Sequence, residues 1–362
     1  MAMTEERMER VKAENCFISF NSAEEMEDFL RKMENSDSRI EVSVASVKTR
    51  ARAENNGNVL YLSTEAGDFP CFNLAMSSLE QRSGDTAIGH SMMSLAQVAD
   101  SMNNYWGLHN PKEKMNIHLR GGKVLQAESE RYAPMSQAAL FRRVADKVQE
   151  LYPNAARFVW GDYTHQMTAA KFAANGELPQ FFQKSWLKAG LPQEELKGAT
   201  IYFTFSTADL ANAAAKVVIE MKSGENRIFM GDEISVVHKD SGDPLSTFQK
   251  KLDGLSETVE DELQKLCRLM EVEIKHPYEA CEAALAKAKV PQMAKKAAKE
   301  LLDILSWEFF GPENAFTLYS SLFGILRTEQ GMRLSDQKKL MISNSLHKLV
   351  SEDWAKFDRP AI

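Results

Sequence analysis

The spacing of apolar residues changes near residue 243, and this change divides the chain into two kinds of structure. After Gly242-Asp243-Pro244, apolar side chains recur at intervals of three and four residues. They are Leu245, Phe248, Leu252, Leu255, Val259, Leu263 and Leu266. Because this spacing places them on one stripe of an α-helix, it predicts one long amphipathic helix over residues 245–266.

Further stretches with helical spacing follow at residues 278–289, 292–308, 313–328 and 335–357. Pro277, Pro291 and the pair Gly311-Pro312 lie between them, at positions where proline starts or ends a helix. No strand pattern is visible beyond residues 272–275. We therefore expect an all-helical C-terminal part, whose own helices rather than a second subunit cover the apolar stripe.

Before residue 243, helical and strand patterns alternate. Ser22 and Glu25 have the spacing of a capping box, which predicts the start of a helix. Helical spacing is found at residues 22–34, 91–106 and 136–151, and strand-like runs at 156–161, 199–206, 216–221, 226–230 and 233–238.

Two β-hairpins are expected in the same part of the chain. Residues 40–47 alternate between apolar and polar side chains, and residues 59–62 follow beyond the turn dipeptide Asn56-Gly57. A second hairpin is predicted over residues 117–126, with Gly121-Gly122 as its turn. The chain is therefore expected to have an α+β fold with a mixed or antiparallel sheet, followed by an all-helical C-terminal region. The predicted domains are residues 1–243 and 244–362.

Composition restricts the possible partners and the cellular compartment. The formal charge is −7, which argues against a histone-like polycation but is compatible with a local basic groove. No apolar run approaches the roughly 18 residues that cross a bilayer, and the polar start resembles no export signal. The four cysteines form no C-x-x-C pair, which is typical of reduced thiols. We expect a cytoplasmic protein of a bacterial host with no membrane contact.

No catalytic residue, metal site or cofactor is assigned from sequence motifs. Phosphate-binding loops, nucleophile elbows and dinucleotide fingerprints are missing from the sequence, and no two histidines have zinc-ligand spacing. His118, His165 and His238 lie in or beside predicted strands, and Asp209 follows another. Their convergence in a pocket would support a metal-dependent enzyme, although binding is favoured over catalysis.

Basic residues gather near both predicted hairpins. Lys48, Arg50 and Arg52 alternate after the first strand, while Arg120, Lys123 and Arg131 surround the second hairpin, with Tyr132 next to it. Cations neutralise phosphates and aromatic rings stack on bases, so these seven residues are candidate nucleic-acid contacts. A solvated sheet face is the alternative interpretation.

Two segments resemble a known family. Residues 128–137, Glu-Ser-Glu-Arg-Tyr-Ala-Pro-Met-Ser-Gln, are similar to the "S-D-R-Y-x-P-L" segment of phage/plasmid-like proteins of unknown function. In this segment Glu130 stands where the family has aspartate. Residues 205–210 and 230–239 resemble two later segments of related proteins on mobile elements. The resemblance implies a phage or mobile-element setting and supplies no catalytic residues.

The hypothesis that we favour is a phage or mobile-element protein that binds nucleic acid, in particular single-stranded DNA during replication or recombination. The first alternative is an oligomeric, non-enzymatic protein that binds a host or phage protein. The second alternative is the metal-dependent enzyme. A shared face for Lys48, Arg50, Arg52, Arg120, Lys123 and Arg131 would favour the first hypothesis, and an exposed apolar patch would favour the protein partner.

Overall fold

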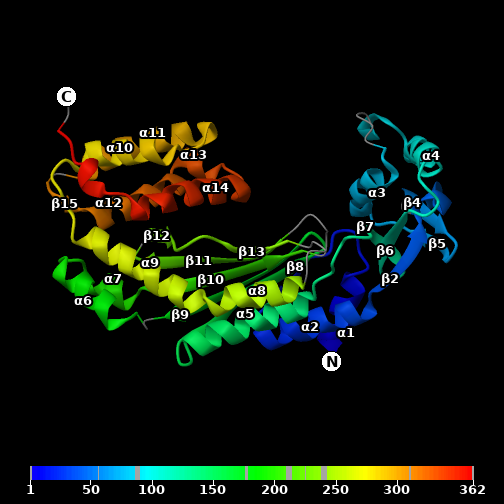
Figure 1. Cartoon of the computed structure of the whole chain (residues 1–362), viewed down its shortest axis with the longest axis horizontal. Helices are drawn as coiled ribbons and strands as arrows, with labels where there is room; N and C mark the ends of the chain where they lie inside the picture. The colour runs from blue at the N-terminus through cyan, green and yellow to red at the C-terminus, as the bar shows by residue number, and fades with distance from the viewer. Residues whose placement is uncertain are drawn as a thin grey trace.

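A seven-stranded antiparallel sheet lies at the centre of the chain (Figure 1). The computed structural model describes residues 2–55, 57–85, 90–175, 178–208, 214–224, 226–237, 243–309 and 311–360. The strand order is β1-β8-β9-β10-β11-β12, with β13 paired to β11. The strands are β1 Ile18–Phe20, β8 Ala156–Thr164, β9 Met167–Asn175, β10 Thr200–Thr207, β11 Ala215–Ser223, β12 Asn226–Phe229 and β13 Ile234–Val236.

One face of this sheet is apolar and is covered by helices. α2 (Ala23–Ser36) packs on β1 and β8, and α5 (Gln137–Leu151) packs on β8, β9 and β10. The ring of Phe141 on α5 lies 5.7 Å from that of Phe172 on β9. The predicted start of α2 is confirmed, because the Ser22 hydroxyl accepts a hydrogen bond from the Glu25 backbone N–H at 3.2 Å. The predicted helix near residues 136–151 is confirmed as well.

The chain between α2 and α5 forms a second body, which we call the inserted lobe (residues 38–129). It contains two three-stranded sheets, in the orders β2-β6-β7 and β3-β4-β5. Its buried side chains, such as Leu62, Met102 and Ile117, form a hydrophobic cluster of their own. Its elements are β2 Ser38–Ser43, β3 Lys48–Glu54, β4 Gly57–Thr64, β5 Gly67–Pro70, α3 Met76–Ser83, α4 Leu95–Trp106, β6 Lys114–Arg120 and β7 Lys123–Ser129.

The first predicted hairpin has the wrong first strand. Residues 40–43 belong to β2, which pairs with β6, whereas the partner of β4 is β3, the basic stretch itself. A short 3-10 turn, Val44–Ser46, separates β2 from β3 and lets the chain move from one sheet to the other. Glu54 pairs with Gly57, and Asn56 lies outside the described residues.

The second predicted hairpin is confirmed. β6 and β7 pair with each other, and Arg120 lies opposite Lys123 across Gly121-Gly122. Gly121 has a φ of 56° and Gly122 a φ of 78°, a left-handed conformation that favours glycine.

Strand β9 was not expected from the sequence. Its stretch Met167–Asn175 contains four alanines, and alanine is the strongest helix former. The strand forms because it is held between β8 and β10, which pair with it over nearly its whole length. Tertiary pairing therefore overrides local propensity here.

The C-terminal part is helical, as predicted. It contains α8 Pro244–Asp253, α9 Leu255–Met270, α10 Pro277–Ala288, α11 Lys295–Glu308, α12 Ala315–Leu322, α13 Glu329–Met332 and α14 Asp336–His347. The strands described in this part, β14 (Glu273–Ile274) and β15 (Glu313–Asn314), are two residues long and pair with each other.

The single long helix predicted over residues 245–266 is wrong in one respect, because it breaks at Gly254 into α8 and α9. Glycine is a weak helix former, so the helix is interrupted at this residue. The apolar stripe nevertheless continues from α8 onto α9. Phe248, Leu252 and Leu263 on this stripe are buried in the same cluster as Leu318 of α12. The chain's own helices therefore cover the stripe.

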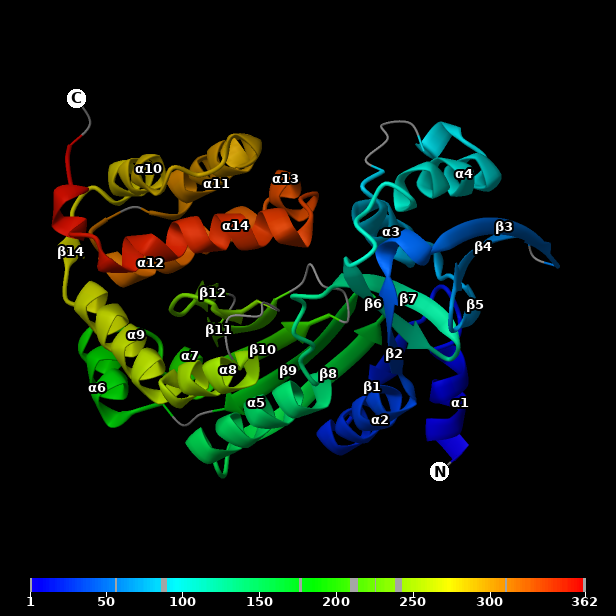
Figure 2. The same cartoon turned by 45° about the vertical axis from the view of Figure 1, so that its right-hand side comes forward.

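The larger hydrophobic cluster spans most of the chain. It includes Phe29 from before the inserted lobe, Phe203 from the sheet and Leu318 from the C-terminal helices. The sequence places a domain boundary near residue 243, whereas this cluster contains residues from both sides of it. The inserted lobe and the helices α10–α14 lie toward opposite ends of the sheet (Figures 1 and 2). No helix within the described ranges is both long and apolar enough to span a membrane.

Candidate nucleic-acid interface

Three of the seven predicted contact residues share one exposed face of β3. Lys48, Arg50 and Arg52 occupy alternate positions of this strand, and all three are exposed. Thr49 points to the other face, where its hydroxyl donates a hydrogen bond to the Ala99 carbonyl of α4 at 2.9 Å. Because α4 covers one face of the strand, the three cations are directed to solvent. We call them the cationic strip.

An aromatic ring lies within the cationic strip. Tyr61 on β4 is directly opposite Arg50 in the strand register, and the Arg52 guanidinium lies 4.3 Å from the centre of its ring. Arg52 also forms an ion pair with Asp68 of β5, and the Tyr61 hydroxyl donates to Glu54 at 2.5 Å. Tyr61 and Asp68 were not predicted as part of this surface. Only the pairing of β3, β4 and β5 places them beside the strip.

Arg52, at one end of the strip, is therefore partly neutralised by Asp68. Among the described residues, Lys48 and Arg50 take part in no ion pair. In Figure 2 the β3–β4 hairpin projects from the inserted lobe, with its tip away from the large sheet. The strip is thus accessible to a large ligand along the hairpin.

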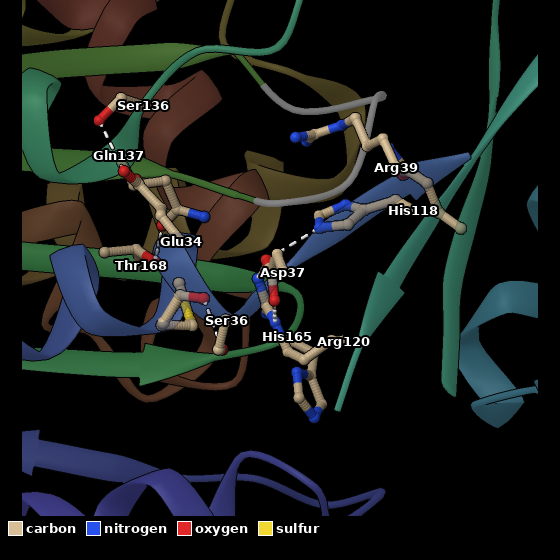
Figure 3. Close-up of polar contacts among 12 residues, drawn as sticks. Glu34, Ser36, Asp37, Arg39, His118, Arg120, Ser136, Gln137, His165 and Thr168 are labelled. Atoms are coloured by element: carbon tan, nitrogen blue, oxygen red, sulfur yellow. Dashed lines mark hydrogen bonds and ion pairs between the residues drawn. The ribbon is translucent and has the colours of Figure 1, made fainter. Parts of the chain in front are cut away.

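Arg120 does not belong to this surface, because its side chain is only 1% exposed. Its Nε donates to Asp37 Oδ1 at 2.9 Å, a second guanidinium nitrogen contacts Asp37 Oδ2, and a third donates to the Tyr163 hydroxyl. Asp37 ends α2, and Tyr163 lies on β8. Arg120 therefore joins the inserted lobe to the large sheet (Figure 3). The sequence prediction of a phosphate contact fails at this residue because the hairpin end is buried at the junction.

His118 lies in the same buried junction, two residues before Arg120 on β6. Its Nε2 is 2.9 Å from Asp37 Oδ2, and its Nδ1 is 3.5 Å from Glu128 Oε1. Burial alone would lower the pKa of His118, but the contacts with the two carboxylates outweigh it and raise the pKa. Burial likewise favours a higher pKa for Asp37 and Glu128, yet their hydrogen bonds with His118 and the neighbouring arginines lower both.

The other predicted contact residues lie apart from the cationic strip. Lys123 on β7 is half-buried, and its Nζ donates to the Lys12 carbonyl at 3.3 Å and lies 5.2 Å from the centre of the Phe72 ring. Arg131 is exposed and Tyr132 half-buried, both in the segment after β7, which belongs to the other sheet of the lobe. The structure therefore brings three of the seven residues onto one strand face.

The predicted histidines do not form a metal site in the described structure. His165 Nε2 donates to the Ala13 carbonyl at 2.9 Å, and its Nδ1 is 3.4 Å from the Tyr163 hydroxyl. Tyr163 links His165 to Arg120, so His118 and His165 share one buried network. His238 and Asp209 lie outside the described residues. Within the described ranges, no group of three or more His, Cys, Asp or Glu side chains is arranged to hold a metal ion.

Comparisons with family models, with curated proteins and with solved structures give no match to this chain. The resemblance to phage and plasmid proteins therefore stays a prediction.

Proposed function

We propose that this protein binds nucleic acid through the cationic strip of Lys48, Arg50 and Arg52. The observation that carries the proposal is their placement at alternate positions on one exposed strand face of a chain whose formal charge is −7. In an acidic protein, clustered exposed cations create a local positive field that attracts phosphates.

The spacing within the strip is suited to a phosphate backbone. Alternate residues of a strand lie about 6.6–6.8 Å apart, which is close to the separation of successive phosphates in an extended nucleic-acid strand. Each phosphate that a lysine or arginine neutralises releases condensed counterions, and this release drives binding at low salt. Tyr61, which lies opposite Arg50 and beneath the Arg52 guanidinium, supplies a ring on which a base can stack.

We further propose, from the sequence resemblance, that the ligand is encountered on a phage or another mobile element. Single-stranded DNA in replication or recombination is the form that we favour. The protein would act in the bacterial cytoplasm as a non-catalytic binder.

Charge reversal on the strip tests the proposal. Binding of a labelled oligothymidine is measured by fluorescence anisotropy at about 50 mM salt, where electrostatic contacts are strong. Lys48→Glu combined with Arg50→Glu should abolish or strongly weaken it. The matched control is Lys296→Glu combined with Lys299→Glu, which makes the same charge change on the exposed face of α11.

The two double variants separate a local site from a general charge effect. A loss confined to the strip variant supports the proposal, whereas equal losses in both variants point to net charge alone. Absence of DNA and RNA binding by the unaltered protein at about 50 mM salt would end the proposal.

One observation favours the alternative of a protein partner. Trp307 on α11 is 78% exposed, and Ile304, one helical turn before it, is 44% exposed. Large exposed apolar side chains are typical of protein interaction sites when they are adjacent. Light scattering of the full chain and of the Trp307→Lys variant tests whether this surface joins subunits. If it does, the substitution should lower the measured molecular mass from that of an oligomer to that of a smaller species.

A further inference from the structure

The second face of the seven-stranded sheet is polar and aromatic rather than apolar. On β10, Ile201, Phe203 and Phe205 are buried in the larger cluster, while Tyr202, Thr204 and Ser206 point the other way and are half-buried. The same alternation continues on β11, where Lys216, Val218 and Lys222 are half-buried. We call this second face the outer face.

The strand register places the outer-face side chains in rows across the sheet. One row contains Phe229, Glu220, Tyr202, Ala173 and Arg157, and the next contains Val218, Thr204, Lys171 and Trp160. Neighbouring side chains in a row are about 4.5–5.5 Å apart at Cβ, and they interact directly. The rows therefore form one continuous surface across β8, β9, β10 and β11, whereas Phe229 of β12 is stacked on the Phe323 ring of the C-terminal part.

A β-bulge holds Trp160 on the outer face. Phe158 pairs with Phe172 and Trp160 pairs with Lys171, so Val159 is an extra residue on β8. Phe158 packs against the core, and both Val159 and Trp160 are exposed, at 40% and 36%. Without the extra residue the alternation would direct Trp160 into the core. The bulge thus keeps a large aromatic ring on the outer face, where it is partly exposed.

The second ring, Tyr202, is fixed in position by charged neighbours. The Lys171 ammonium lies 4.4 Å from the centre of the Tyr202 ring and 2.9 Å from Glu220 Oε2. Lys171 and Glu220 are both 8% exposed, so their ion pair is part of the floor of the surface. A ring that is held in this way loses little conformational entropy when a ligand binds.

Cations without an ion pair among the described residues lie on the same face as these rings. Arg157 lies in the Tyr202 row, and Lys222 and Arg227 lie directly opposite each other on β11 and β12. Like charges at directly opposed strand positions repel each other and destabilise a sheet. An anion bound between Lys222 and Arg227 would remove this repulsion, which points to a polyanionic ligand.

We propose that the outer face binds single-stranded nucleic acid, with bases stacked on Trp160 and Tyr202 and phosphates on Arg157, Lys222 and Arg227. This proposal deepens the proposed function and rests on its ligand class, but it uses a different surface. A paired duplex keeps its bases stacked inside, so rings on a sheet face select unpaired strands.

Quenching of tryptophan fluorescence can report directly on ligand binding at this surface. The chain has five tryptophans, of which Trp106, Trp186 and Trp354 are at most 1% exposed. In a Trp307→Phe background, Trp160 is the remaining exposed tryptophan. We expect oligothymidine to quench its emission and the matched duplex to quench it much less. No quenching at a concentration at which anisotropy shows saturated binding would overturn the proposal.

Ring removal gives the second measurement. Trp160→Ala should weaken binding of oligothymidine by about 5- to 150-fold. The salt dependence should be unchanged, because the substitution removes a stacking contact and leaves every phosphate contact in place. Trp160→Phe should retain most of the affinity. The matched control is Val159→Ala, which shortens the exposed neighbour on the same bulge and should leave binding unchanged.

The outcomes distinguish this proposal from the proposed function. If Lys48→Glu with Arg50→Glu weakens binding while Trp160→Ala does not, the strip binds and the outer face does not. If Trp160→Ala weakens binding and the strip variant does not, the outer face is the site. Quenching by a polyglutamate peptide equal to that by oligothymidine would also overturn the proposal, because the surface would then be a general polyanion or protein site.

Discussion

Arg120 of β6 and Asp37 at the C-terminal end of α2 form a buried, bidentate ion pair where the inserted lobe meets the large sheet. The Nε–Oδ1 distance is 2.9 Å, and the side chains are 1% and 6% exposed. His118 contacts the same carboxylate from the adjacent side (Figure 3). One aspartate therefore balances two groups of the lobe.

Removing that aspartate should be costly. Asp37→Ala leaves the Arg120 guanidinium buried without its carboxylate, and such a loss typically costs about 3–5 kcal/mol of unfolding free energy. Urea denaturation followed by circular dichroism measures the change. Lys32→Ala is the matched control, since Lys32 pairs with Asp28 on the same helix and both side chains are about half exposed (48% and 50%), so a cost within about 1 kcal/mol is expected there. Equal costs would contradict the structural role of Asp37.

The junction also predicts how stability varies with pH. The pKa of His118 is raised on folding, so its contribution is complete below the unfolded pKa of about 6.5 and is lost as the pH rises through the folded pKa. The pKa values of Asp37 and Glu128 are lowered, so their contribution is present above about pH 4.5 and is lost as the pH falls through the folded values.

Tm should therefore be higher near pH 6 than near pH 8. His118→Gln should reduce this difference without removing it, because the pKa values of His90 and His109 are raised as well. Calorimetry at both pH values, with His109→Gln for comparison, measures the share of each histidine. A Tm difference unaffected by His118→Gln would show that the junction does not titrate in this range.

The salt dependence of nucleic-acid binding should identify the phosphate contacts. For single strands, log K falls with log salt by about 0.7 for each phosphate neutralised. Arg50→Gln should reduce this slope by about that amount, whereas Trp160→Ala should leave it unchanged. Titrations at four salt concentrations give the slopes, and an unchanged slope in Arg50→Gln would remove Arg50 from the interface.

A side chain at Gly161 on β8 is predicted to force its neighbours to shift. A Cβ built there would lie 2.4 Å from Met26 Sδ and 2.9 Å from Phe158 Cζ, at the contact between the sheet and α2. Gly161→Ala should therefore destabilise the fold by about 1–3 kcal/mol through overpacking. Gly107→Ala is the control, because no atom lies within 4 Å of its Cβ position and its φ is −69°. Chemical denaturation of both variants measures the difference.

Local signals in the sequence predicted the elements that depend on neighbouring residues. The Ser22 cap and the Gly121-Gly122 turn require only residues within one turn, and both are confirmed. Arg120 shows why the candidate site was harder to predict. Its partner Asp37 is 83 positions away, so an arginine beside a turn gave no sign of burial. The outer face was missed because the alanines of β9 favour a helix, so no strand was predicted there. The rows that contain Trp160 and Tyr202 form only when β9 pairs with β8 and β10.

The placement of β1 has a consequence for the order of folding. β1 pairs with β8, and the hydrogen bond from the Ser19 hydroxyl to Asp162 joins residues 143 positions apart. During synthesis β1 therefore stays unpaired until the whole inserted lobe has left the ribosome. The lobe has its own core and its hairpins close short loops, so it can fold first. Once folded, it shortens the loop that β1 must close to reach β8, which lowers the entropic cost of completing the large sheet.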